Sequence, residues 1–163
     1  DRQKLGLVME FYAWENMCLG YQDKDHYKSK KIFMNNAVLK RETEERIKKF
    51  DVRPRNAILP AKSFSGGNQQ KIVLAREMEQ NPKLLIVGQP TRGVDIGAIE
   101  FIHRRIIQLR DAGKAVILIS VELDEILSLS DRIMVMFDGK MMGEKKASST
   151  NERELGLLMA GIE

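Results

Sequence analysis

Apolar residues recur along this chain with two different spacings. Between residues 65 and 130, apolar side chains three or four positions apart predict amphipathic helices. Between these helices, short uninterrupted apolar runs predict buried parallel strands. This alternation of helix and strand is typical of an α/β layered fold. In chain order, the predicted elements are a helix over residues 67–80, a strand over 84–87, a helix over 96–109, a strand over 115–119 and a helix over 122–129.

The last part of the chain is predicted from its turn and cap residues. Asp138-Gly139 separates two short apolar runs, residues 132–137 and 140–143, and both positions of such a turn need positive φ. A β-hairpin is therefore predicted there. Ser149 and Glu152 have the spacing of a capping box, which predicts the start of a final helix.

Residues before position 60 follow a different pattern. Helical spacing predicts a short helix over residues 13–19 and a longer, strongly charged helix over residues 36–50. We therefore expect three regions: a small helical subdomain over residues 1–60, an α/β core over residues 61–147 and a C-terminal helix within residues 148–163.

Composition excludes several classes of protein. The 163 residues are 43% apolar and 31% charged, with a net charge of +4, which is ordinary for a soluble globular domain. Lysine and arginine are scattered without interleaved aromatic residues, so no nucleic-acid partner is expected. Cys18 is the only cysteine, which excludes an internal disulfide and a four-cysteine zinc site.

The sequence also bears on location. The longest apolar run, residues 115–119, is far too short to span a membrane, and no signal-peptide pattern follows Asp1. We expect a cytosolic location. Because the chain opens at Asp1 and not at methionine, we also expect a fragment of a longer protein.

The most informative stretch covers residues 63–71 (Ser-Phe-Ser-Gly-Gly-Asn-Gln-Gln-Lys), a glycine-bearing turn that opens directly into a helix. The first backbone N–H groups of a helix have no intrahelical partner, and the helix dipole is positive at that end. The turn is therefore a candidate anion site. The alternative is a plain N-cap turn with glycines that serve helix packing.

Residues 64–71, followed by residues 89–95 (Gln-Pro-Thr-Arg-Gly-Val-Asp), resemble the ATP-binding subunits of ABC transporters. The likeness is strongest to the second, C-terminal nucleotide-binding half of the fused subunits that drive simple-sugar and nucleoside importers. It covers nearly the whole chain, because residues 1–8, 15–16 and 131–140 also match. The resemblance implies an incomplete P-loop NTPase core, RecA-like, with a small helical subdomain.

In such subunits two halves pair head to tail, and each ATP lies between the phosphate loop of one half and the signature turn of the other. The resemblance implies that Ser65, Gly66, Gly67 and Asn68 contact the γ-phosphate held by the partner half. It places Asp95 in a loop that contacts the opposite half. Asp95 is also a candidate N-cap for the helix that follows, and both roles can hold.

Three positions depart from the family pattern. Gly88 stands where an aspartate organises Mg²⁺, Gln89 where a glutamate polarises the attacking water, and Val121 where a histidine contacts the γ-phosphate. A carboxamide cannot accept a proton, so general-base assistance of about 10²–10⁴-fold would be absent. We expect no catalytic residue and no metal ligand in this stretch, and a site that binds nucleotide weakly or holds it without turnover.

The sequence contains no Gly-x-x-x-x-Gly-Lys-Ser/Thr phosphate loop. The family fold places the strand before that loop, the Walker A strand, between the strands predicted at residues 115–119 and 132–137. We therefore expect a gap there, and we expect ATP and Mg²⁺ to be bound mainly by the partner half.

The leading hypothesis is a fragment of the ATP-hydrolysing subunit of an ABC importer for nucleosides or simple sugars, inactive by itself. The implied partners are the first nucleotide-binding half, the membrane permease subunits and, indirectly, a substrate-binding protein. The implied location is cytoplasmic and peripheral on the inner face of the membrane. The alternatives are a non-catalytic regulatory or dimerisation module with an ABC-like fold, and a soluble ABC ATPase of translation or DNA repair.

Overall fold

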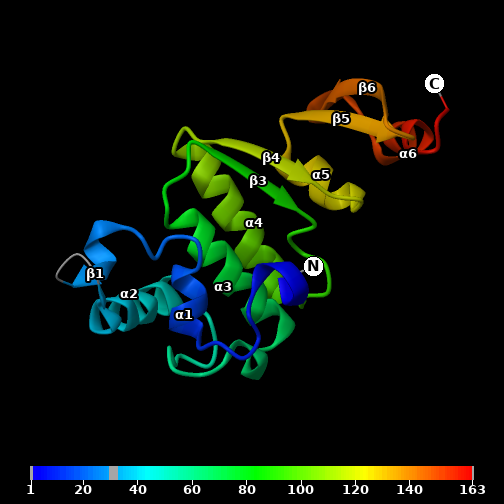
Figure 1. The fold of residues 1–163 in the computed structure, drawn as a ribbon. Helices are drawn as coiled ribbons and strands as arrows, with labels where there is room; N and C mark the ends of the chain where they lie inside the picture. Colours follow the sequence, from blue (N-terminus) through cyan, green and yellow to red (C-terminus); the bar gives the residue numbers. More distant parts are fainter. Residues whose placement is uncertain (1, 30–32, 163) are drawn as a thin grey trace. The chain divides into compact units, whose positions relative to one another are not determined.

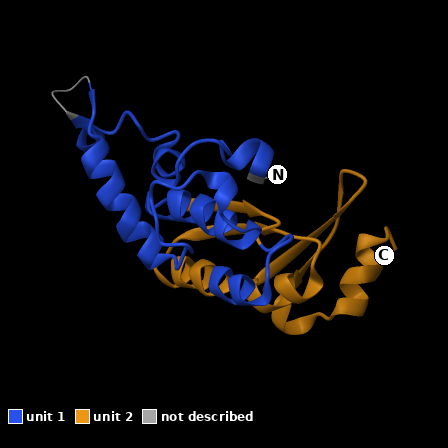
Figure 2. Cartoon of the chain, turned by 90° about the horizontal axis from the view of Figure 1, so that it is seen from below, with its two compact units in different colours: residues 1–83, 91–102 blue, residues 84–90, 103–163 orange. Residues whose placement is uncertain are grey.

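The structure, a computed structural model, describes residues 2–29 and 33–162; Asp1 lies outside the described residues. The chain divides into two compact units, shown in Figure 2. Unit 1 comprises Asp1–Lys83 and Thr91–Ile102, and unit 2 comprises Leu84–Pro90 and His103–Glu163. These limits differ from the expected limits at residues 60 and 147, which stay a prediction.

Unit 1 is mainly helical. The helices predicted over residues 13–19, 36–50 and 67–80 are confirmed to within two residues at each end. In chain order the elements are a π-helical turn Arg2–Gly6, α1 Ala13–Cys18, a 3₁₀ turn Asp25–Tyr27, β1 Lys28–Ser29, β2 Phe33–Met34, α2 Asn36–Lys49, a 3₁₀ turn Ala61–Ser63, α3 Gly66–Met78 and the first part of α4 Ile96–Asp111 (Figure 1).

Asn16 on α1 holds the loop that precedes this helix. Its side chain is fully buried, and its Oδ1 accepts a hydrogen bond from the backbone N–H of Val8 at 2.8 Å. Its Nδ2 donates to the carbonyl oxygens of Val8 and Phe11 at 3.0 and 3.1 Å. A buried amide with satisfied partners supports this loop together with the backbone hydrogen bond from the Phe11 N–H to the Val8 carbonyl oxygen at 3.0 Å. The loop over residues 8–12 therefore has a defined position against α1.

Unit 2 contains two pairs of strands (Figure 1). β3 Leu84–Gly88 and β4 Ala115–Ile119 are parallel, with Gly88 opposite Ile119. β5 Arg132–Phe137 and β6 Lys140–Lys146 form the predicted hairpin. Its turn residues, Asp138 and Gly139, have φ values of +46° and +73°, as the turn requires. The remaining elements are α5 Leu123–Leu129, a 3₁₀ turn Ala147–Ser149 and α6 Glu152–Met159.

β4 and β5 belong to separate sheets in the described part of the chain, so they are not paired side by side. This agrees with the expected gap between them, and the missing Walker A strand itself stays a prediction. The expectation that the parallel strands are buried was only half right. Leu85 and Val87 are buried, but alternate side chains are exposed. These exposed apolar residues are Leu84, Ile86, Ile117 and Ile119.

The cap of α6 differs from the predicted one. Asn151, and not Ser149, is the N-cap, because its Oδ1 accepts from the backbone N–H of Glu154 at 3.0 Å. Ser149 lies in the preceding 3₁₀ turn and donates to the carbonyl oxygen of Lys146. Asn151 and Glu154 have the same three-residue spacing as the predicted pair, so the local rule fits both positions and the longer-range fold selects one. α6 then buries Leu155 and Leu158 against the hairpin.

Candidate nucleotide-contacting site

The turn at residues 65–68 is open at its helix start. Ser65 is the N-cap of α3, has extended backbone angles and is exposed. The first helical hydrogen bond runs from the Gln69 N–H to the Ser65 carbonyl oxygen at 2.8 Å. Within the described residues, the N–H groups of Gly66, Gly67 and Asn68 donate to no protein acceptor. Three unpaired donors at the start of a 13-residue helix have the chemistry of an anion site.

The hydroxyl of Ser65 does not cap its own helix. Its Oγ accepts a hydrogen bond from Nδ2 of Asn68 at 2.9 Å. The Oδ1 of Asn68 in turn accepts from the backbone N–H of Arg53 at 2.7 Å. The structure thus brings Ser65 and Asn68 together and connects both to the loop after α2.

Gln69 supports the turn from inside the unit. Its side chain is buried, and its Nε2 donates to the carbonyl oxygens of Ala61 and Phe64 at 3.2 and 2.9 Å. Its Oε1 accepts from Gln3 at 3.2 Å. No role for Gln69 is predicted from the sequence. One sequence signal could have indicated that Gln69 is buried: it lies three residues before Ile72 and so shares the apolar face of the predicted helix.

Lys71 ties α3 to the loop that carries Arg53. Its ammonium is largely buried, donates to the Asp51 carbonyl oxygen at 3.0 Å and lies 4.8 Å from the centre of the Phe101 ring. The hydrogen bond from Nε of Arg53 to Asp51, at 3.0 Å, lowers the pKa of the Asp51 carboxyl. This role of Lys71 was also not predicted, because it depends on residues twenty or more positions away.

Asp95 and Gly67 lie against each other where α3 and α4 begin. Oδ1 of Asp95 accepts from the backbone N–H of Ala98 at 2.9 Å, which is the N-cap bond considered from the sequence. A Cβ on Gly67 would lie 3.0 Å from Oδ2 of Asp95 and 3.1 Å from Cβ of Ala98. Packing therefore leaves little room for a side chain at position 67. The contact of Asp95 with an opposite half stays a prediction.

Gly88, Gln89 and Val121 occupy the carboxyl end of the β3–β4 pair. The N–H of Gln89 donates to the Ile119 carbonyl oxygen at 2.7 Å, and Gln89 has a positive φ of +51°. Val121 follows β4 and is 62% exposed. A Cβ added at Gly88 meets no atom within 4 Å, so its lack of a side chain is not imposed by crowding.

The donor set at this sheet end does not fit a Mg²⁺ site, because Mg²⁺ prefers carboxylate oxygens and neither Gly88 nor Gln89 provides one. Across residues 2–29 and 33–162, no group of three or more His, Cys, Asp or Glu side chains is arranged to hold a metal ion. The turn at residues 65–68, called the signature turn below, has instead three N–H donors of the kind that bind a phosphate. The predicted site residues thus fall into two sets, one in each unit.

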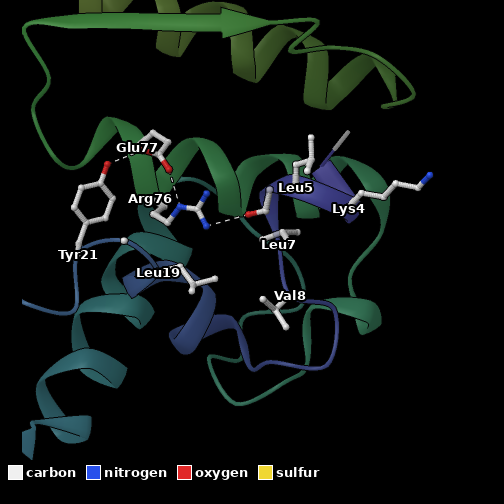
Figure 3. Close-up of a pocket in the computed structure, with 10 residues that line it drawn as sticks. Lys4, Leu5, Leu7, Val8, Leu19, Tyr21, Arg76 and Glu77 are labelled. Atoms are coloured by element: carbon white, nitrogen blue, oxygen red, sulfur yellow. Dashed lines mark hydrogen bonds and ion pairs between the residues drawn. The ribbon is translucent and has the colours of Figure 1, made fainter.

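A cleft of about 500 Å³ in unit 1, shown in Figure 3, has no lining residue from the turn at residues 65–68. The guanidinium of Arg76 donates to the Gly6 carbonyl oxygen at 3.0 Å and pairs with Glu77 at 2.7 Å. Tyr21 donates to Glu77 at 2.6 Å, which raises the pKa of Tyr21 to about 12. The side chains of Tyr21, Arg76 and Glu77 are thus engaged within this cleft. Leu5 and Val8 supply its exposed apolar edge.

No protein-family model matches the chain. Among curated proteins, the nucleoside import ATP-binding protein NupA of Lactococcus lactis is 49% identical over 99% of this chain. The guanosine import ATP-binding protein NupO of Bacillus subtilis is 47% identical, and the ribose import ATP-binding protein RbsA of Clostridium perfringens is 38% identical, each over 99% of this chain. The chain spans 31–32% of the length of these relatives.

The fold is compared with solved structures. The ATP-binding cassette MJ0796, in a dimeric post-hydrolysis state bound to ADP and Pi, matches with a TM-score of 0.70 and 25% identity, covering 89% of this chain and 60% of that one. The cassette MJ1267 in its ADP conformation matches with a TM-score of 0.65 and 22% identity, covering 94% of this chain and 60% of that one.

The fold is that of an ABC cassette, as the sequence predicted. Along nearly its whole length the chain is similar to the C-terminal half of ABC import ATP-binding proteins for nucleosides and ribose. The family resemblance predicted from the sequence is therefore confirmed. In the part of the chain that the structure describes, no helix is both long enough and apolar enough to cross a membrane.

Proposed function

We propose that this chain is part of the ATP-hydrolysing subunit of an ABC importer for nucleosides or simple sugars, and that it presents its signature turn to ATP held by the other nucleotide-binding half. The observation that carries the proposal is the exposed turn at Ser65, with three unpaired N–H groups behind it. The similarity to nucleoside, guanosine and ribose import ATP-binding proteins supports the solute class.

Under this proposal, Ser65, Gly66, Gly67 and Asn68 line the γ-phosphate. The helix dipole contributes about 0.3–1 kcal/mol at an exposed site and about 2 kcal/mol when partly buried. Hydrogen bonds to a charged group add about 1.5–3 kcal/mol each. These terms are too small for tight binding by one turn alone, because association itself costs several kcal/mol. Most of the affinity for ATP and Mg²⁺ must come from the partner half.

The chain's own nucleotide position is proposed to be degenerate. Gly88 and Gln89 provide no carboxylate for a metal ion or for a proton, and the aliphatic side chain of Val121 provides no hydrogen bond. Hydrolysis in the complete subunit would then take place at the site whose phosphate loop and catalytic carboxylate belong to the first half. Asp95, exposed beside the signature turn, would contact that half.

The proposed partners follow from the same role. They are the first nucleotide-binding half, the permease subunits and, indirectly, a substrate-binding protein, and the assembled subunit would lie on the cytoplasmic face of the membrane. Gly88 and Gln89, which carry no carboxylate, fit a half that pairs with a competent one. The alternative, a purely regulatory module with an ABC-like fold, predicts pairing that does not depend on nucleotide.

The test is pairing of this chain with the separately produced first half of the same subunit. ATP is added under conditions where hydrolysis is blocked, and association is measured by analytical ultracentrifugation. The proposal expects pairing with ATP and little pairing with ADP, because only ATP supplies the γ-phosphate. Ser65→Arg, which fills the space in front of the turn, should abolish the pairing seen with ATP. Ser63→Arg, at an exposed position two residues before the turn, is the matched control and should retain it. Pairing that is independent of nucleotide would support the regulatory-module alternative.

A further inference from the structure

The side-chain amide of Asn68 bridges two partners, and the identity of one partner fixes its orientation. The backbone N–H of Arg53 can only donate, so the amide atom 2.7 Å from it must be the oxygen. The other end, 2.9 Å from Oγ of Ser65, is therefore the NH₂ group. The hydrogen bond between these two side chains consequently runs from Asn68 to Ser65.

This direction determines what the Ser65 hydroxyl can do. A hydroxyl carries one hydrogen and two lone pairs, and here one lone pair accepts the bond from Asn68. In the described part of the chain, the hydroxyl hydrogen has no protein acceptor, and Ser65 is exposed. A hydroxyl that already accepts a hydrogen bond is also a stronger donor, because hydrogen bonds in a chain polarise one another. Phosphate oxygens at neutral pH are mainly acceptors.

We infer that Asn68 is a positioning residue, which holds the Ser65 hydroxyl as a hydrogen-bond donor toward the γ-phosphate. The inference rests on the proposed function, because it needs a phosphate at the turn. It goes further in giving Asn68 a role that is exerted through Ser65.

The loop that anchors Asn68 is itself fixed. Arg53 is held by its hydrogen bond to Asp51, and the carbonyl oxygen of Asp51 accepts from the buried Lys71 of α3. The backbone N–H that orients the amide therefore belongs to a loop tied back to the same helix. In this way, the loop after α2 sets the direction of a hydroxyl on the signature turn.

Asn68→Asp in the full-length subunit removes the donor and adds one negative charge. The carboxylate has the same shape and still accepts from the Arg53 N–H, but it has no hydrogen to give, so the Ser65 hydroxyl must donate to it. We expect ATP turnover to fall about 10- to 100-fold, the size of one hydrogen bond to a charged group. Asn56→Asp is the control for the added charge, since it places one negative charge in the loop that carries Arg53 and keeps an acceptor for the Ile58 N–H, now 3.0 Å from Oδ1 of Asn56.

A double-mutant cycle separates positioning from direct contact. ATP turnover is measured for Asn68→Asp, for Ser65→Ala and for the variant that carries both substitutions. We expect the turnover of the double variant to match that of the less active single variant within about twofold. If Asn68→Asp lowers turnover as strongly in the Ser65→Ala background, the inference is overturned while the proposed function stands. If Ser65→Ala has no effect on turnover, the Ser65 hydroxyl contributes nothing and the inference is overturned, whereas the proposed function is tested separately by Ser65→Arg.

Hydrogen exchange of the Arg53 amide gives a readout that does not depend on ATP. The amide should exchange slowly in the wild type and in Asn68→Asp, where an acceptor oxygen is present, and faster in Asn68→Ala. Slow exchange in Asn68→Asp also shows that the variant has kept its fold. Fast exchange in the wild type would mean that the anchor does not exist, and the positioning role would be overturned.

Discussion

Replacing Gly67 with alanine tests how closely the starts of α3 and α4 approach. The added Cβ would lie 3.0 Å from Oδ2 of Asp95 and 3.1 Å from Cβ of Ala98. Ala98 is buried within α4, and Asp95 is held by its cap bond to the Ala98 N–H. Overpacking of this kind costs about 1–3 kcal/mol. Alanine in place of glycine in a helix returns about 0.5–1 kcal/mol.

Gly156→Ala is the matched control, because Gly156 lies within α6 and a Cβ there meets no atom within 4 Å. Both substitutions gain about the same helix propensity, so the difference between them isolates the clash at Gly67. We expect Gly156→Ala to stabilise the chain and Gly67→Ala to be less stable than it by about 1–3 kcal/mol. Urea unfolding followed by far-UV circular dichroism measures both. Equal unfolding free energies in the two variants would refute the close approach.

Three further predictions concern single side chains in unit 1. Asn16→Asp places a buried carboxylate against the carbonyl oxygens of Val8 and Phe11, to which the amide now donates. It should lower the free energy of unfolding, measured in urea, by about 2–5 kcal/mol. An unchanged free energy of unfolding would exclude the buried hydrogen bonds of Asn16. Lys71→Met keeps the unbranched apolar part of the side chain but loses the ammonium with its hydrogen bond and ring contact, so a loss of about 1–2 kcal/mol is expected in the same assay. Unchanged stability would argue against this contact between Lys71 and the loop after α2. Tyr21 should titrate near pH 12, above the ordinary value of 10.0, because Glu77 disfavours the phenolate; its contribution to stability is present below about pH 10 and is lost as pH rises through about 12. Ultraviolet absorbance against Tyr21→Phe measures this titration, and ionisation of Tyr21 at pH 10 would contradict it.

Local signals were sufficient for most elements. The strand at residues 115–119 has the predicted bounds, and the Asp138-Gly139 turn has the predicted backbone, because both depend on neighbouring residues only. Period and turn chemistry act over a few positions, and such rules transfer from one protein to another. The ABC-cassette fold also followed from the sequence, through the signature stretch at residues 64–71.

The site could not be built from local signals. The bond between Asn68 and Arg53 joins residues 15 positions apart, and that between Gln69 and Gln3 joins residues 66 apart. Neither partner is implied by spacing. Gly67 illustrates the same limit, since the sequence suggested either phosphate approach or helix packing, and only the fold shows what its missing Cβ would meet. Long-range contacts decide which of several compatible roles a residue takes.

The central claim is that the turn at Ser65 meets the γ-phosphate of ATP held by another half. ATP hydrolysis by the full-length subunit carrying Ser65→Arg tests it most directly, with Ser63→Arg as the control for an added charge on the same exposed segment. Arginine at position 65 removes the hydroxyl and fills the space where a phosphate would lie. We predict that Ser65→Arg abolishes hydrolysis and that Ser63→Arg retains it; hydrolysis at the wild-type rate by Ser65→Arg would contradict the account.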